Sequence, residues 1–196
     1  MPKDVAQAFA WFRKAADQGD ADGQCHLGEM YGWGAGVRMD ESEAARLFHL
    51  AADQGHARAQ FYLGTLYRDG VGVKPDFAQS VAWLRKAAEQ GDQRAQVWLA
   101  DMYLTGRGVP YDAVTAMTWL RSAAEQGFAD AQVRLGRAYF EAPQGVKQDY
   151  AAAIKWFRQA AGQGDAAGQF YLGYMNARGS GLPKDGVEDS SLQTGS

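Results

Sequence analysis

The chain is poor in cysteine, in proline and in excess charge of either sign. Its single cysteine, Cys25, cannot form an intramolecular disulfide or a metal site built from several thiolates. The 20 basic and 23 acidic residues give a net charge of −3, whereas nucleic-acid binders usually carry a basic excess or a basic face. No uninterrupted apolar stretch approaches the roughly 20 residues of a membrane-spanning helix. We therefore expect neither a nucleic-acid partner nor membrane insertion.

Glycine, by contrast, is abundant, with 24 residues against five prolines, and its spacing is periodic. Gln-Gly pairs end at Gly19, Gly55, Gly91, Gly127 and Gly164. These positions are 36 residues apart, or 37 in the last interval, and a Leu-Gly or Leu-Ala pair follows each of them. The one additional residue falls in a predicted loop at 141–146. A fixed period with an insertion confined to a loop predicts an array of structural units.

Each unit is predicted to contain two helices. The first, such as 57–67, has apolar or small residues at helical spacing. A capping aspartate precedes three of these helices, but His56 and Phe128 replace it in two units, so we expect those two helices to start less firmly. The second helix, such as 76–89, begins with a capping aspartate and ends just before a glycine. Its predicted buried residues are Ser80, Trp83, Leu84, Ala87 and Ala88.

A consensus can be read from these units over residues 4–185. It runs Ala-x-Ala-Gln-x-x-Leu-Gly-x-x-Tyr, then Gly-x-Gly-Val, then Asp-x-x-x-Ala-x-x-Trp-Leu/Phe-x-x-Ala-Ala-x-x-Gly. This pattern resembles the Sel1-like repeat family, whose members are relatives of the tetratricopeptide repeat. The resemblance implies an all-α solenoid whose first helices line a concave groove and usually bind other proteins. The sequence departs from the pattern where Ala100 replaces the glycine, Leu47 the tryptophan and Asn176 the tyrosine.

The same pattern predicts one repeat array at 1–185 and a tail at 186–196. The array is predicted to comprise a lone second helix at 4–17 capped by Asp4, helix pairs at 20–55, 56–91, 92–127 and 128–164, and a lone first helix at 165–178. It begins halfway through a unit, and neither end has the polar capping unit that normally closes a solenoid. We therefore expect a fragment of a longer array, ends covered by a partner, or self-association through uncapped ends. The N-terminus has no secretion signal, which favours the cytoplasm, whereas loss of an exported N-terminus would leave the periplasm or secretion open.

Three features that can carry chemistry have a plainer interpretation. Residues 32–36 are glycine-rich like a phosphate-binding loop, but no strand precedes them and similar glycines recur as helix-end turns in other units. The histidines His26, His49 and His56 have no third ligand at a metal-binding spacing. Cys25 occupies a position that is apolar in the other units, which predicts a small buried side chain. Because no pattern combines a nucleophile, a base and an orienting group, we predict a non-enzyme without metal or cofactor.

One face of the first helices varies from unit to unit. Each first helix is numbered here from residue 21, 57, 93, 129 or 166. Its second, sixth, ninth and thirteenth residues vary, and at ~100° per residue these places fall within ~60° of each other. We call this face, which the core is not expected to constrain, the variable stripe. It comprises Asp22, His26, Glu29, Trp33, Arg58, Tyr62, Thr65, Asp69, Arg94, Trp98, Asp101, Thr105, Asp130, Arg134, Arg137, Glu141, Ala167, Tyr171, Tyr174 and Arg178.

The variable stripe is rich in tryptophan, tyrosine and arginine, the residue types enriched at the energetic centres of interfaces. Its candidate protein-binding residues are His26, Arg58, Tyr62, Arg94, Trp98, Asp101, Arg134, Arg137, Tyr171 and Tyr174. They predict a non-enzymatic adaptor or scaffold that holds a peptide or protein in the groove. The family resemblance also allows a dedicated inhibitor or immunity-type protein that neutralises one enzyme or toxin. A plainer interpretation is that the aromatic side chains only pack against the neighbouring first helix.

Overall fold

The computed structural model describes residues 4–179, which form ten α-helices of 13 residues each and contain no strand. The helices are α1 (Val5–Asp17), α2 (Ala21–Trp33), α3 (Glu41–Asp53), α4 (Ala57–Asp69), α5 (Phe77–Glu89), α6 (Gln93–Thr105), α7 (Ala113–Glu125), α8 (Ala129–Glu141), α9 (Tyr150–Gly162) and α10 (Ala166–Arg178). None of these described helices has the length and hydropathy required to cross a membrane. The tail predicted at 186–196 lies outside the described residues.

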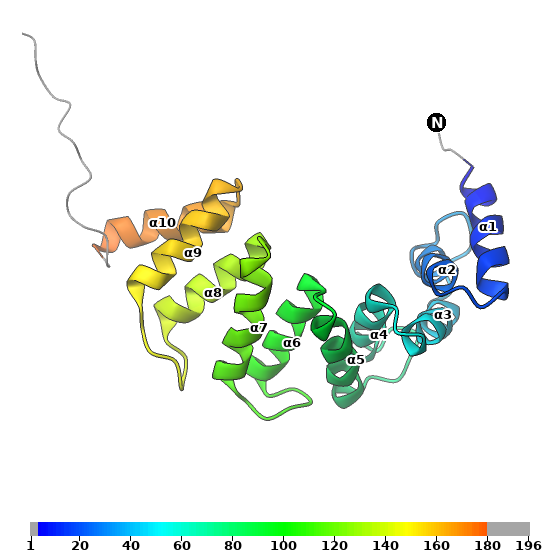
Figure 1. Cartoon of the computed structure of the whole chain (residues 1–196), viewed down its shortest axis with the longest axis horizontal. Coiled ribbons are helices and arrows are strands. Elements are labelled where there is room, and N and C mark those ends of the chain that lie inside the picture. Colours follow the sequence, from blue (N-terminus) through cyan, green and yellow to red (C-terminus); the bar gives the residue numbers. More distant parts are fainter. Residues whose placement is uncertain (1–3, 180–196) are drawn as a thin grey trace, which may run out of the picture. The chain divides into compact units, whose positions relative to one another are not determined.

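The described residues divide into two compact units, with the division between Gln126 and Gly127. From here on, "first unit" and "second unit" mean these two compact parts and not single repeats. The first unit holds α1 to α7, and the second unit holds α8 to α10. Within each unit every helix packs against the next one along the chain, as Figure 1 shows. The predicted all-α solenoid of paired helices is therefore confirmed.

Aspartate caps most of the helices. The side chains of Asp20, Asp40, Asp76, Asp92, Asp112, Asp149 and Asp165 each accept a hydrogen bond from a backbone N–H in the first turn that follows. Each of them has the extended backbone that this geometry requires. The cap predicted at Asp4 is wrong, because its φ of 23° departs from that conformation and its side chain makes no cap bond.

Two helices, α4 and α8, begin without an aspartate, and of these two only α4 has a side-chain cap. The weak start predicted for α4 is wrong, because Nδ1 of His56 accepts the Ala59 N–H at 3.1 Å. Nδ1 must then be unprotonated, so we place the ring proton on Nε2, which lies 2.9 Å from Oδ1 of Asp22. The prediction for α8 is confirmed, since Phe128 makes no side-chain cap bond. The His56 imidazole thus takes the role that an aspartate carboxylate has as the cap of most other helices.

Close contact inside a helix pair depends on a small residue in the first helix. A Cβ atom at Gly64 would lie 2.7 Å from Cγ of Leu84, so only the bare glycine backbone fits at this spacing. A Cβ atom at Gly136 would lie 2.6 Å from Cε1 of Phe157. At Gly173 no described atom lies within 4 Å of the Cβ position, since α10 is the last described helix. The repeated Leu-Gly pair therefore sets how closely paired helices approach.

Buried glutamines join the two helices of each pair, and Gln60 also bonds to the preceding pair. Nε2 of Gln90, at the end of α5, donates to Oε1 of Gln60 in α4 at 2.7 Å, and Nε2 of Gln60 donates to the carbonyl of Ala52 at 3.1 Å. The same amide pair joins Gln54 to Gln24 at 2.8 Å, Gln126 to Gln96 at 3.0 Å and Gln163 to Gln132 at 2.9 Å. These bonds satisfy amides that are buried in the core and would otherwise be costly. The sequence shows both repeated glutamines, but we did not predict that they pair.

The side chains predicted to be buried in the second helices lie in the core. Ser80, Trp83, Leu84, Ala87 and Ala88 are each at most 7% exposed. Cys25 is also buried, at 1% exposure, as predicted, and desolvation raises the pKa of its thiol to about 12. Trp11 has the same place in α1 as Trp83 in α5 but is 65% exposed, because no first helix precedes α1 among the described residues.

Candidate protein-binding surface

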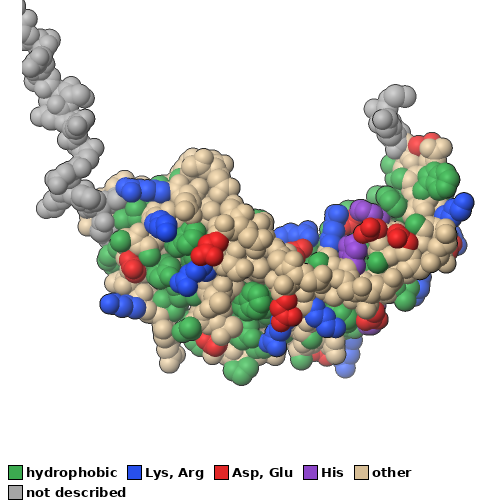
Figure 2. Space-filling model, viewed as in Figure 1, with side chains coloured by type: hydrophobic (Ala, Val, Ile, Leu, Met, Phe, Trp, Pro, Cys, Tyr) green, Lys and Arg blue, Asp and Glu red, His purple; other side chains and the backbone are tan. Residues whose placement is uncertain are grey.

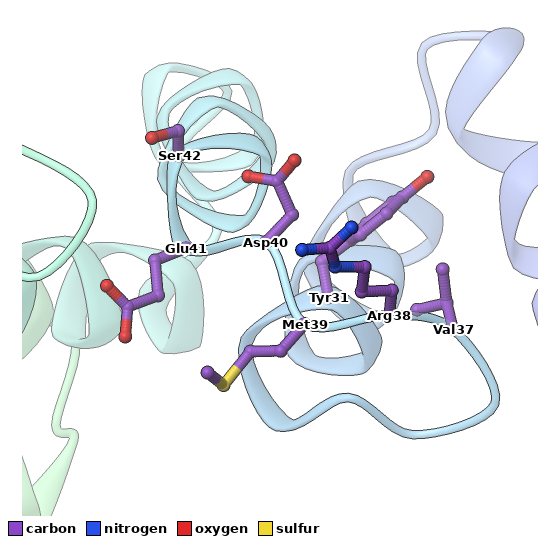
Figure 3. A pocket seen from close by; sticks show the side chains of 7 residues that line it. All are labelled: Tyr31, Val37, Arg38, Met39, Asp40, Glu41 and Ser42. Carbon is purple, nitrogen blue, oxygen red and sulfur yellow. The ribbon is translucent and has the colours of Figure 1, made fainter.

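An open notch of about 630 Å³ lies where the loop after α2 leads into α3 (Figure 3). It is lined by Tyr31, Val37, Arg38, Met39, Asp40, Glu41 and Ser42. The Asp40 N–H donates to the carbonyl of Tyr31 at 3.0 Å, which fixes the loop. One repeat later the Asp76 N–H donates to the carbonyl of Tyr67 at 2.8 Å, and a similar notch is found there. Because the repeat itself produces this notch, we do not regard it as a specific site.

A buried carboxylate joins the variable stripes of α2 and α4. Oε1 of Glu29 lies 2.6 Å from Nη2 of Arg58, and Oε2 of Glu29 lies 3.1 Å from Nδ1 of His26. The His26 ring also stacks on Phe12, with 4.8 Å between ring centroids. Figure 2 shows histidine side chains among acidic and basic ones near these two helices. Glu29 belongs to the variable stripe, but no signal in the sequence distinguished it from an exposed acidic residue.

Tyr62 lies at the centre of the candidate residues in the first unit. Nε of Arg58 donates to the Tyr62 hydroxyl at 3.4 Å, and this hydroxyl, together with the Glu29 carboxylate, raises the pKa of Arg58. The Cζ atoms of Arg58 and Arg94 lie 5.7 and 5.8 Å from the Tyr62 ring. Arg94 is also 2.9 Å from Oδ2 of Asp92. Two guanidinium groups from successive first helices therefore meet at one tyrosine.

The aromatic candidates are only half exposed. Tyr62 packs against Phe48, with ring centroids 4.9 Å apart, and Trp98 packs against the core of α5 and α6. Cζ of Arg68 lies 3.6 Å from the Trp98 ring centroid. The expectation that the core does not constrain the variable stripe is therefore wrong for these side chains. Helix periodicity predicts their direction, but not how closely the next first helix approaches them.

Arg68 was not a candidate, because it falls outside the four variable places. Its side chain is 17% exposed, and Nη2 lies 2.6 Å from Oδ2 of Asp69. Asp101, which is a candidate, is half-buried on α6, and its backbone carbonyl accepts the Thr105 hydroxyl at 2.7 Å. Two members of the variable stripe therefore contact the Arg68 guanidinium, the Asp69 carboxylate and the adjacent Trp98 ring.

The four candidates of the second unit form a separate group. Nε of Arg134 lies 2.9 Å from Oδ2 of Asp130, and Nη2 of Arg137 lies 2.9 Å from Oε1 of Glu141, each within α8. Tyr171 stacks on Phe157, with ring centroids 4.8 Å apart and planes 9° apart. Tyr174 contacts Phe140 edge-to-face at 5.9 Å. Cζ of Arg137 lies 5.8 Å from the Tyr171 ring, so the α8 and α10 stripes meet there.

One enclosed recess opens on the variable stripe of the first unit. This α2–α4 pocket has a volume of about 290 Å³. It is lined by Glu29, Gly32, Trp33, Glu41, Ala44, Phe48, Tyr62, Thr65, Leu66 and Val71. Across residues 4–179, no group of three or more His, Cys, Asp or Glu side chains is arranged to hold a metal ion. Four of the residues that line the α2–α4 pocket, Glu29, Trp33, Tyr62 and Thr65, belong to the variable stripe.

The Sel1 repeat pattern matches the chain at 1–20, 21–56, 57–92, 93–128, 129–165 and 166–188. The chain belongs to the Sel1 repeat family. Sel1 repeats generally serve as non-catalytic protein-interaction modules. A Sel1 repeat protein from Oxalobacter formigenes is 36% identical, with a TM-score of 0.84, and the match covers 93% of this chain and 75% of that one.

Two further solved structures are similar. The protective antigen c5321 of uropathogenic Escherichia coli is 33% identical over 92% of this chain and 46% of its own, with a TM-score of 0.58. The immunity protein Pa5087 of Pseudomonas aeruginosa is 24% identical over 86% of this chain and 62% of its own, with a TM-score of 0.56. The second likeness shows a shared fold alone. No curated protein matches the sequence.

Proposed function

We propose that this Sel1 repeat chain is a non-enzymatic adaptor that binds a peptide or protein along the variable stripe of its first unit. The observation that carries the proposal is the convergence of Arg58 and Arg94 on Tyr62. Arginine and tyrosine supply much of the binding energy at many interfaces, particularly near their centres. Trp98 extends this group along α6.

The chemistry of the two arginines indicates what they bind. Their side chains are 42% and 40% exposed, so each keeps part of its guanidinium open to solvent. Each already has one carboxylate partner, Glu29 or Asp92, which holds it in place. A planar guanidinium has five N–H donors, more than one carboxylate uses. An acidic side chain or a chain terminus of the partner can therefore bond to the remaining donors.

Affinity capture with matched variants tests this proposal. Arg94→Ala should lose the captured partner, while Arg13→Ala, which removes an exposed arginine from α1 in the same unit, should retain it. We expect Arg94→Ala to weaken binding by ~1–3 kcal/mol, measured by calorimetry with the purified partner. If both variants bind the partner as tightly as the unmodified chain, the variable stripe of the first unit is not the binding surface.

A dedicated inhibitor or immunity-type protein is the second candidate. The name of Pa5087 describes such a role for a protein with this fold. The same capture experiment separates the two candidates. Several partners favour an adaptor, whereas a single enzyme or toxin that loses activity on binding favours an inhibitor.

We also propose that copies of the chain associate through aromatic side chains on α1 and α10. Trp11 is 65% exposed and Phe170 is 64% exposed, and each has the chemistry of a buried contact. Sedimentation at rising protein concentration tests the proposal. The sedimentation coefficient should rise with concentration, and Trp11→Ser should reduce the rise. A coefficient that corresponds to a monomer at every concentration would contradict it.

A further inference from the structure

The α2–α4 pocket has walls suited to one long side chain. The rings of Trp33 and Tyr62 meet edge-to-face, with centroids 6.2 Å apart, and Phe48 tilts against Tyr62 at 4.9 Å. Leu66 and Val71 complete an apolar lining. The volume of about 290 Å³ is small for a drug-sized ligand but sufficient for a single amino-acid side chain.

The charged groups of the pocket are all acidic. Its lining contains two carboxylates, Glu29 and Glu41, and no lysine, arginine or histidine. Glu29 is compensated by Arg58, which lies 2.6 Å away. Glu41 is exposed, and none of the ion pairs found among residues 4–179 includes it. Figure 3 shows the Glu41 carboxylate pointing away from Arg38 and Asp40 in the neighbouring notch. The pocket therefore has one uncompensated negative charge at its rim.

We infer that the α2–α4 pocket binds a basic side chain, lysine or arginine, presented by the partner. The aliphatic stem lies along Phe48 and Leu66, and the cationic head reaches the Glu41 carboxylate beside the exposed Trp33 ring. Aromatic faces attract cations, and long basic side chains commonly bury their stems while the head stays near water. An acidic side chain would meet two carboxylates, and an apolar one would leave Glu41 unused.

This inference rests on the proposed function, because the pocket opens on the same variable stripe. Its test does not require the partner. The full chain, labelled with ¹⁵N, is titrated with Nα-acetyl-lysine methylamide and separately with Nα-acetyl-norleucine methylamide, which has the same stem without the ammonium group. The indole N–H of Trp33 reports binding. The indole of Trp11, 65% exposed against 64% for Trp33, is the internal control.

We expect the lysine probe to shift the Trp33 resonance and to bind about threefold more tightly than the norleucine probe, as one partly exposed charge contact allows. Glu41→Gln should abolish this preference. Glu89→Gln, which removes an exposed carboxylate at the end of α5, should leave it unchanged. Glu41 is exposed in the first turn of α3, so its substitution is not expected to unfold the chain.

Three results would overturn the inference. Equal or tighter binding of the norleucine probe would mean that the pocket takes an apolar side chain. Equal shifts of the Trp33 and Trp11 resonances would mean non-specific binding. No Trp33 shift at ~50 mM probe, where even a single side chain should bind measurably, would mean that the pocket receives neither side chain. None of these outcomes decides whether Arg94 binds the partner, so the proposed function stands or falls separately.

Discussion

Replacing Gly64 with alanine sets two opposing effects against each other. Glycine inside a helix costs about 1 kcal/mol relative to alanine, so the methyl group favours the helix itself. That methyl would lie 2.7 Å from Cγ and 3.2 Å from the backbone nitrogen of Leu84. Because backbone is involved, rotation of the Leu84 side chain cannot remove the whole conflict. Overpacking of this kind costs about 1–3 kcal/mol, so we expect Gly64→Ala to lower the free energy of unfolding by up to about 2 kcal/mol.

Gly173→Ala is the matched control. It makes the same change at the equivalent place in α10, where no described atom lies within 4 Å of the Cβ position. Only the higher helix propensity of alanine acts there, so the free energy of unfolding should rise by up to about 1 kcal/mol. The difference between the two variants isolates the contact with Leu84 and should be about 1–3 kcal/mol.

Urea unfolding followed by far-ultraviolet circular dichroism measures both changes, fitted with a nearest-neighbour model because repeat arrays need not unfold in one step. Ala100 fills the equivalent place in α6 and is fully buried, so a helix pair in this chain can accept a methyl group. Gly64→Ala therefore tests whether the α4–α5 spacing is fixed. Equal stabilisation by Gly64→Ala and Gly173→Ala would refute the assigned packing.

Three further predictions concern single side chains. The raised pKa of Cys25, about 12 against 9.0, means that the unfolded chain releases the thiol proton first. The buried neutral thiol therefore contributes fully to the free energy of unfolding below pH 9, and this contribution falls by about 1.4 kcal/mol per pH unit between pH 9 and 12. Cys25→Ala should remove this loss from the pH dependence of the free energy of unfolding. Gln90→Ala should cost about 1–3 kcal/mol in urea unfolding because it removes the donor to the buried Oε1 of Gln60, whereas Gln18→Ala, which loses only a bond within its own helix, should cost less. His56→Ala should cost about 1 kcal/mol by removing a cap, and a cost no larger than that of His49→Ala, which breaks an exposed pair, would show that the imidazole cap is unimportant.

The sequence predicts the scaffold well because the scaffold repeats. A place that holds glycine or alanine in every unit, such as Gly64, must meet the same packing demand each time, and the contact with Leu84 has this form. Cys25 is predicted to be buried for the same reason, by comparison with its apolar equivalents. Where one repeat has a residue that the others lack, comparison between repeats cannot predict what that residue does. His56 caps α4 through a ring nitrogen that depends on rotamer and tautomer, and the sequence specifies neither.

The candidate surface is predicted only in part, because helix periodicity gives direction without distance. It correctly assigns Arg58, Tyr62 and Arg94 to one face, and the structure brings them together. It does not predict that Glu29 is buried beneath that face or that Trp98 rests on the core. Both outcomes depend on the spacing between successive first helices, which is set by contacts on the opposite side of each helix.

The glutamine pairs have a consequence for how such a chain can change. Each pair joins a side chain at one fixed place to another at a second fixed place about 30 residues later, and neither place lies on the variable stripe. A whole period of 36 residues can therefore be duplicated, deleted or exchanged with every amide still meeting an amide. The exchanged segment brings its own variable side chains with it. Recombination between repeats, rather than substitution one residue at a time, is thus a direct route to a new variable stripe on an unchanged framework.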